Sequence, residues 1–409
     1  MLKIPAQICD EPSREKQQVL LADWRRNRGI RSHCASLRTV LPLPATQSDT
    51  FNGTGVVRPT DARVADRVRR THALSLRAVS GTLAERVQRL FPGLVLLGVL
   101  AGLATLVAGV VPGVNALLLG VVFGAVVANT TGVPAWARPG VRTQTILLEA
   151  GIVLLGARIA VDELVASGVT LVVLVVVTVV ASILLVEVVA GRVFGLARDT
   201  SSLLAAGASI CGVSAATAIA GTIDADGESL AHVVATVLLF DAITLAVFPI
   251  AGDVLPLTGR QFGVWAGLSM FSTGPVTAAG FAHSDVAGQW ATVTKLARNS
   301  MLGVVALWYA FRYAGGSSAD VRAVLDGVPR FLVGFVALAA LTNVGVFSGD
   351  VLAAFDTGSD VLFALAFVGL GLDVRLAAMR ETGMTPVFVL AVQLLTVSVV
   401  TLGAVVVLV

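Results

Sequence analysis

Two basic residues stand inside a long apolar stretch, where charged side chains are rare. Lys295 and Arg298 are three positions apart, which places both on one face of a helix. A cation inside a bilayer is costly unless it is paired or faces water, so such residues mark solute pathways by default. The alternative is that both extend to the nearby membrane surface, because they begin only about six residues into the stretch. The pair predicts attraction of an anion.

Asp241 is the acidic counterpart, near the centre of the stretch VVATVLLFDAITLAVF. Because it is too deep to reach water at either end, it needs a partner. Lys295 or Arg298 could supply that partner, or Asp241 could exchange a proton and couple proton movement to solute movement. Structural ion pairing and proton coupling both stay open at this point.

Two further apolar stretches are rich in Gly, Ser and Thr. One is AAGASICGVSAATAIA, residues 205–220, and the other is SMFSTGPVTAAG, residues 269–280, with a Gly-Pro pair at its middle. Helices can break at such places, and a half-helix N-terminus offers unpaired N–H groups to an anion. The alternative is that the small residues are packing surfaces. The candidate binding residues are Ser209, Cys211, Gly212, Ser214, Thr217, Ser272 and Thr273.

The elements that must position these residues are membrane-spanning helices. Of 409 residues, 56% are hydrophobic and 13% are charged, whereas soluble domains are about a quarter charged. Apolar stretches recur near the ~20 residues that a helix needs to cross a bilayer. We predict an all-α, polytopic membrane protein with about eleven spans, at residues 90–110, 113–129, 143–161, 168–190, 201–222, 229–250, 262–282, 290–311, 329–347, 359–378 and 385–408.

Charge in the loops predicts the orientation, because short loops bearing Lys or Arg stay in the cytoplasm. Alternate predicted loops carry basic residues, which are Arg138, Arg142, Arg192, Arg198, Arg260, Arg312, Arg322, Arg330, Arg375 and Arg380. The opposite loops carry acidic residues instead, which are Asp162, Glu163, Asp224, Asp226, Glu228, Asp285, Asp350, Asp356 and Asp360. The pattern predicts a plasma-membrane protein with its N-terminus in the cytoplasm and its C-terminus outside.

Residues 1–85 differ from the rest of the chain, since they are polar, rich in Arg and without an apolar period. They predict a disordered cytoplasmic tail or a misassigned translation start, and residues 86–409 form the membrane domain. The basic residues fit membrane orientation rather than nucleic-acid binding. The motifs of ATP hydrolysis, zinc proteases and serine hydrolases are absent from the sequence. We therefore expect no enzyme, no catalytic residues, no cofactor and no metal.

Six segments in order carry a resemblance to a known family. They are GIVLLGARI from residue 151, SICGVSAA from 209, FGVWAG from 262, TVTKLAR from 292, VPRFLVGF from 328 and GLGLDVRL from 369. Over residues 90–409 the chain resembles the bacterial and archaeal YeiH-like membrane proteins of the UPF0324 type. That family is usually labelled as candidate sulfate exporters.

The resemblance implies a secondary transporter with inverted repeats and broken helices crossing near the middle of the membrane. It implies site positions at Ile210, Cys211, Gly212, Ser214 and Ala215, with Lys295 and Arg298 in the eighth stretch. The family typically has a His and an acidic residue where this chain has Phe271 and Ser272, so the ion role of that pair does not carry over.

The predicted function is secondary transport of a small anion, with sulfate the family-derived candidate and Asp241 as coupling group or ion pair. The lipid bilayer is the expected partner, nucleic acid is not, and homo-oligomerisation is left open. The alternative is a carrier of an organic solute coupled to Na⁺ or H⁺, with a fold like that of bile-acid symporters.

Overall fold

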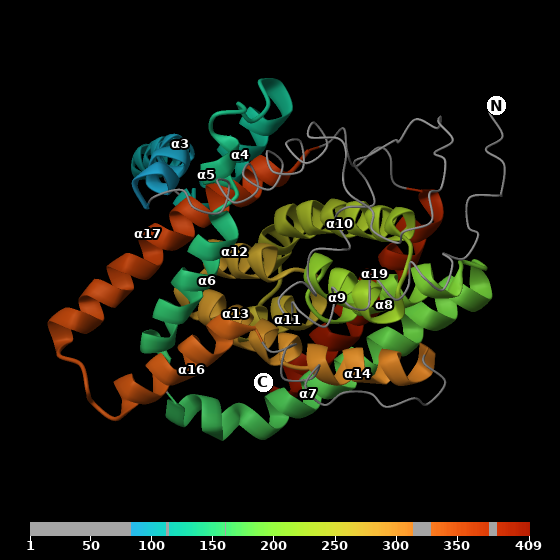
Figure 1. Cartoon of the computed structure of the whole chain (residues 1–409). Coiled ribbons are helices and arrows are strands. Elements are labelled where there is room, and N and C mark those ends of the chain that lie inside the picture. The colour runs from blue at the N-terminus through green and yellow to red at the C-terminus, as the bar shows by residue number, and fades with distance from the viewer. Residues whose placement is uncertain (1–82, 112–113, 160, 314–328, 376–382) are drawn as a thin grey trace, which may run out of the picture. The chain divides into compact units, whose positions relative to one another are not determined.

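The computed structural model describes residues 83–111, 114–159, 161–313, 329–375 and 383–409, which form helices joined by short loops (Figure 1). Residues 1–82 of the predicted tail lie outside the described residues. The helices are α3 (Leu83–Val110), α4 (Ala116–Thr130), α5 (Arg138–Val141), α6 (Gln144–Leu155), η1 (Gly156–Arg158), α7 (Val161–Glu187), η2 (Val188–Val193), α8 (Arg198–Ser209), α9 (Val213–Ile223), α10 (Gly227–Val254), α11 (Gly259–Ser269), α12 (Thr273–His283), α13 (Asp285–Asn299), α14 (Leu302–Tyr313), α16 (Arg330–Asn343), α17 (Gly349–Asp373) and α19 (Met384–Leu408).

Six of the described helices are long and apolar enough to cross a membrane, by length and composition. Shorter apolar helices include Ala116–Thr130 and Arg330–Asn343. Large apolar side chains point outward along these helices; Leu106 of α3, for example, is 70% exposed. Outward apolar surface on helix after helix is what a bilayer requires and water opposes. The prediction of an all-α, polytopic membrane protein is confirmed.

Residues 201–222, predicted as one span, form the hairpin α8–α9 instead. Thr200 Oγ1 donates to Ser229 Oγ across 3.2 Å, so α8 begins beside the start of α10, which directly follows α9. Laid end to end, the two helices would separate their outer ends by roughly 35 Å. An ideal Cβ on Gly207 of α8 would lie 3.6 Å from Ala216 Cβ of α9, so the two helices pack on each other. The chain enters and leaves at the same end of the bundle.

Residues 262–282 form a second hairpin, α11–α12. The ring of His283 at the end of α12 stacks on Phe262 in the first turn of α11, with centroids 4.3 Å apart. A Cβ on Gly259 would lie 2.7 Å from Ser284 Oγ, which again brings the two outer ends together. Helix α13 starts at this end and packs along both arms of the hairpin.

These two hairpins correct the predicted count of eleven crossings and the sides of two loops. Asp226 precedes α10 at the end where α8 begins, and Arg260 stacks over Trp290 of α13 at the opposite end. A hairpin followed by a further helix occurs twice, first as α8–α9 and α10 and then as α11–α12 and α13. The second unit begins at the opposite end of the bundle from the first. Inverted repeats have this arrangement.

Helices α3, α4, α5 and α17 form a second region, which we call the glycine-packed region. A Cβ on Gly371 of α17 would lie 2.8 Å from the carbonyl carbon of Val121 and 3.0 Å from the nitrogen of Ala125, both in α4. Gly124 of α4 meets the backbone of α17 in the same way. Only residues without a side chain allow two helix backbones to approach so closely.

Candidate functional site

The tips of the two hairpins meet, and this contact defines the candidate site. Gly212 in the first tip has φ +67° and ψ −128°, a conformation that favours glycine. A Cβ at this position would overlap Ser272 Oγ and lie 3.2 Å from Ser272 Cβ in the second tip. The breaks are therefore at residues 210–212 and 270–272. Pro275, predicted at the second break, lies in the first turn of α12, where proline is tolerated.

Arg298 lies fully buried behind both tips. Its Nη2 donates to Ala208 O at 3.0 Å and its Nε to Ser209 O at 3.2 Å, at the end of α8. Its Nη1 donates to carbonyl oxygens at the end of α11, namely those of Gly267 at 2.9 Å, Leu268 at 2.7 Å and Met270 at 2.9 Å. One guanidinium thus serves the carboxyl-terminal ends of two half-helices, where a positive charge is favoured.

Lys295 is also fully buried, one helical turn before Arg298, and its Nζ donates to Met270 O at 2.9 Å. Among the residues that the structure describes, neither cation lies within 4.0 Å of a carboxylate oxygen. Neither side chain extends to the membrane surface, so the surface alternative is wrong. The site holds two buried basic groups.

Asp241 of α10 also contacts the second tip and is 6% exposed. Its Oδ1 accepts a hydrogen bond from the backbone N–H of Ser272 at 3.1 Å, at the start of α12. The side chain of Ser272 does not cap this helix, and the N-cap residue of α9 is Gly212, which has no side chain to cap with. A carboxylate therefore occupies one half-helix N-terminus, and the N-terminus of α9 has no side-chain cap.

The remaining predicted residues divide into two groups. Cys211 is buried in the first tip, and Ser209 Oγ turns away from the tips to donate to Ser182 Oγ of α7 at 2.8 Å. Ser214 and Thr217 are exposed on α9, and Thr217 Oγ1 donates to the carbonyl of residue 213 at 2.9 Å. The structure brings Cys211 and Ser214 to the break. Ser209 contributes its backbone carbonyl there but not its side chain, and Thr217 lies one turn further along α9.

One residue of the site was not predicted. Asn299 follows Arg298 directly, is 3% exposed, and its Nδ2 donates to Thr273 Oγ1 at 3.0 Å in the first turn of α12. Its Oδ1 is buried without a hydrogen-bond partner. A polar amide beside two buried cations was a visible signal, since buried polar groups in a membrane are costly. Asn299 joins Thr273 as a neighbour of the second tip.

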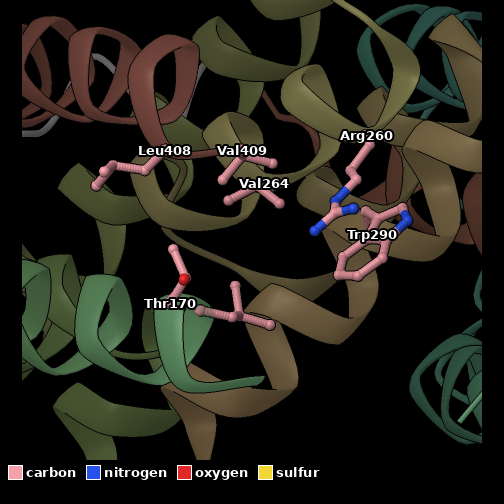
Figure 2. Close-up of a pocket in the computed structure, with 7 residues that line it drawn as sticks. Thr170, Arg260, Val264, Trp290, Leu408 and Val409 are labelled. Carbon is pink, nitrogen blue, oxygen red and sulfur yellow. The ribbon is translucent and has the colours of Figure 1, made fainter. Parts of the chain in front are cut away.

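The pocket drawn in Figure 2 lies elsewhere. Its volume is about 220 Å³, and it lies between α7, α11, α13 and the end of the chain. In its wall the guanidinium of Arg260 from α11 lies over the ring of Trp290 from α13, 4.5 Å from the ring centroid. Its lining is Thr170, Leu171, Arg260, Val264, Trp290, Leu408 and Val409. None of the predicted binding residues is among them, so this pocket is not the candidate site.

Comparison with known proteins identifies the family. A family model described as "Conserved hypothetical protein 698" matches residues 92–390, and relatives are named UPF0324 membrane proteins. The chain belongs to this family. The predicted resemblance to YeiH-like proteins is confirmed, because a UPF0324 inner membrane protein YeiH of Salmonella typhi is 30% identical over 306 residues, 72% of this chain and 87% of the relative.

Two more UPF0324 relatives extend over most of their own length. One, from Yersinia pestis, is 32% identical over 321 residues, 73% of this chain and 87% of the relative. Another, from Pseudomonas aeruginosa, is 31% identical over 337 residues, 78% and 94% respectively. No solved structure matches the chain. The names of these relatives place them in a membrane and name no solute.

Proposed function

We propose that this protein is a secondary transporter of a small anion, held at the tips of the two hairpins. The observation that carries the proposal is a charge imbalance, because Lys295 and Arg298 are fully buried at touching breaks where Asp241 is the nearby carboxylate. Buried charge in a membrane is unfavourable unless it is compensated. A bound anion would supply the missing negative charge.

The helix termini at the tips favour the same solute. Arg298 occupies the negative ends of α8 and α11, and Asp241 accepts from an N–H at the start of α12, so the half-helix end left for a solute is the N-terminal end of α9. Half-helix N-termini attract anions through unpaired N–H groups and the helix dipole. Alternating access would expose this site to each side of the membrane in turn. Sulfate is the solute that the family label suggests.

Flux measured in proteoliposomes tests the proposal. Lys295→Met should abolish uptake of labelled sulfate or another small oxyanion, because it removes the ammonium and keeps the length of the side chain. Gly102→Ala is the control, since no atom lies within 4 Å of the position where its Cβ would be. Wild-type flux in Lys295→Met protein would remove the anion site from these tips.

A second candidate function rests on Asp241. A buried carboxylate at a half-helix N-terminus suits a carrier of an organic solute coupled to Na⁺ or H⁺. A thermal-stability screen separates the two, since a ligand stabilises the state that binds it. Stabilisation by Na⁺ and not by anions would favour this second function. Asp241→Asn should remove dependence on a pH gradient if Asp241 carries the proton.

The rest of the proposal concerns the membrane in which the protein lies and its orientation there. We place the protein in the plasma membrane with its N-terminus in the cytoplasm and its C-terminus outside, acting in transport and not as an enzyme. Basic residues of the described loops near α5 and α8, such as Arg142 and Arg198, support this orientation. Labelling of single cysteines from each side of intact cells would test it.

A further inference from the structure

We propose that Arg298 is a positioning residue that joins the two hairpins into one unit, and that it is not an anion ligand. Where it concerns transport, this inference rests on the proposed function. Where it concerns the backbone, it stands on the hydrogen bonds of Arg298 alone. The consequence is that the tips of α8–α9 and α11–α12 open and close together.

The carbonyl groups at the end of α8 show why the residue is needed. The last carbonyls of a helix have no partner within it. Ala206 O accepts from the nitrogen of Ile210 and Gly207 O from that of Gly212, which leaves Ala208 and Ser209. Arg298 donates to both remaining carbonyls.

Arg298 is also the donor for carbonyl groups at the end of α11. Ala266 O accepts from the nitrogen of Met270, and the carbonyls of Gly267, Leu268 and Met270 accept from Arg298 Nη1. The acceptors lie in two separate hairpins, so moving one hairpin away from the other would strip carbonyls of their donor in a buried site. Such groups are costly when unpaired.

The number and geometry of the donors assign different roles to the two cations. Nε has one N–H and one carbonyl contact, and Nη1 has two N–H groups for three carbonyl contacts, so an anion at either nitrogen would displace a backbone carbonyl. Nη2 has one N–H beyond its contact with Ala208 O. Lys295 has one backbone contact and three N–H donors. A lysine at position 298 would keep the charge, but it lacks the planar fork that reaches both helices.

Hydrogen exchange of the purified full-length protein, without any added anion, tests the inference. In Arg298→Lys, peptides covering residues 206–213 and 266–273 should both exchange about tenfold or more faster than in the wild type. Lys295→Met should affect the second peptide alone, because Lys295 contacts Met270 and not α8. A peptide of α3 near Leu97, buried in the glycine-packed region, is the unchanged reference. Faster exchange in one hairpin alone, or in neither, would overturn the inference.

A wild-type measurement covers the case in which Arg298 variants fail to fold. At increasing denaturant the two tip peptides should open with the same dependence on concentration, as one cooperative unit. Separate dependences for the two tips would refute the inference without any variant.

Transport kinetics separate positioning from binding. Arg298→Lys should lower the maximal rate of anion flux and leave KM within about twofold, whereas loss of a ligand raises KM. A KM raised about tenfold or more would make Arg298 a ligand and overturn its assigned role. If the wild-type protein moves no anion, the proposed function fails, and the exchange experiments still decide the role of Arg298.

Discussion

The hairpin region of α8–α13 and the glycine-packed region of α3, α4, α5 and α17 solve the same problem by different means. Both bring helix backbones close together inside a membrane. In the glycine-packed region the helices are continuous at the contact, and glycines such as Gly124 and Gly371 remove the side chains between them. In the hairpin region the helices end, and Arg298 donates hydrogen bonds to carbonyl groups that have no partner within those helices.

The difference shows what each region is built to allow. Continuous helices satisfy their own backbone, so their contact needs shape and no charge. Ended helices expose polar groups, so their contact needs a fixed donor, and it also leaves half-helix N-termini for a solute. The charged chemistry concentrates in the hairpin region for this reason, and the following predictions test that division in order of decreasing effect.

The largest effect is expected from a single methyl group between α4 and α17. Gly371→Ala would place a Cβ against the backbone of Val121 and Ala125, which cannot move without shifting a helix. We expect a loss of about 3 kcal/mol in the free energy of unfolding, as overpacking causes. Thermal unfolding in detergent measures it.

The matched control is Gly102→Ala in α3, which meets no atom within 4 Å. It should leave stability unchanged or raise it slightly, because alanine favours helix. If the two variants behaved alike, glycine packing would not be what holds α4 to α17.

A smaller loss of stability, with a larger loss of flux, is expected at the hairpin tips. Gly212→Ala combines a left-handed φ of +67° with overlap of Ser272 Oγ. The backbone strain costs about 1–3 kcal/mol, because few residues other than glycine adopt this φ and ψ, and Ser272 Oγ can rotate to relieve part of the overlap. The double variant Gly212→Ala, Ser272→Gly should relieve the overlap and so regain part of the lost stability, while the backbone strain remains. Failure of the double variant to recover stability would place the cost entirely in the backbone.

Ion pairs at the rim of the bundle should matter less than either backbone contact. The Nε of Arg158 lies 2.7 Å from Asp356 Oδ1, and its Nη2 lies 2.9 Å from Asp360 Oδ1, but the two carboxyl side chains are 47% and 63% exposed. Exposed pairs contribute little, so Arg158→Gln should cost about 1 kcal/mol or less. A loss as large as that of Gly371→Ala would mean that charge also holds the rim together.

The smallest effect is expected at the cap of α10, outside the spanning segment. The N–H of Ser229 donates to Asp226 Oδ1 at 2.8 Å and lowers the pKa of that carboxyl below its usual range. A carboxyl group whose pKa is lower in the folded than in the unfolded protein stabilises the fold at pH values above its usual pKa. This stabilisation is lost as the pH falls through the lowered pKa of the folded protein. Asp226→Ala should therefore be slightly less stable than wild type at neutral pH, and the gap should close below about pH 3. A gap that is independent of pH would show that charge is irrelevant to the cap.

The sequence predicted the helices and the breaks but not the hairpins. Two antiparallel helices of eleven or twelve residues, such as α8 and α9, have the same apolar length as one span, and hydropathy cannot distinguish them. Loop charge did not expose the error either. The two hairpins enter from opposite ends, so among the described loops those outside the hairpins keep their predicted ends, while Arg260 and the loop around Asp226 change ends.

The sequence indicated the charged residues of the candidate site but not the groups that they contact. Lys295, Arg298 and Asp241 were visible because ionisable residues are rare in apolar stretches. Their division of roles was hidden, since the acceptors of Arg298 are backbone carbonyls, which no residue type reveals. Thr217 lies on an exposed face of α9 with its hydroxyl bonded to the carbonyl of residue 213, and its role as a binding residue stays a prediction.

The separation of Ala208 and Arg298 along the chain, 90 positions, sets an order on biosynthesis. Ribosomes add about 5–20 residues per second, so roughly 5–20 s pass between the two. Throughout that interval the terminal carbonyls of the first hairpin are without the donor that Arg298 supplies. The α8–α9 tip can therefore reach its final form only after α13 has been made, which makes the completion of this hairpin a late event in the life of each new chain.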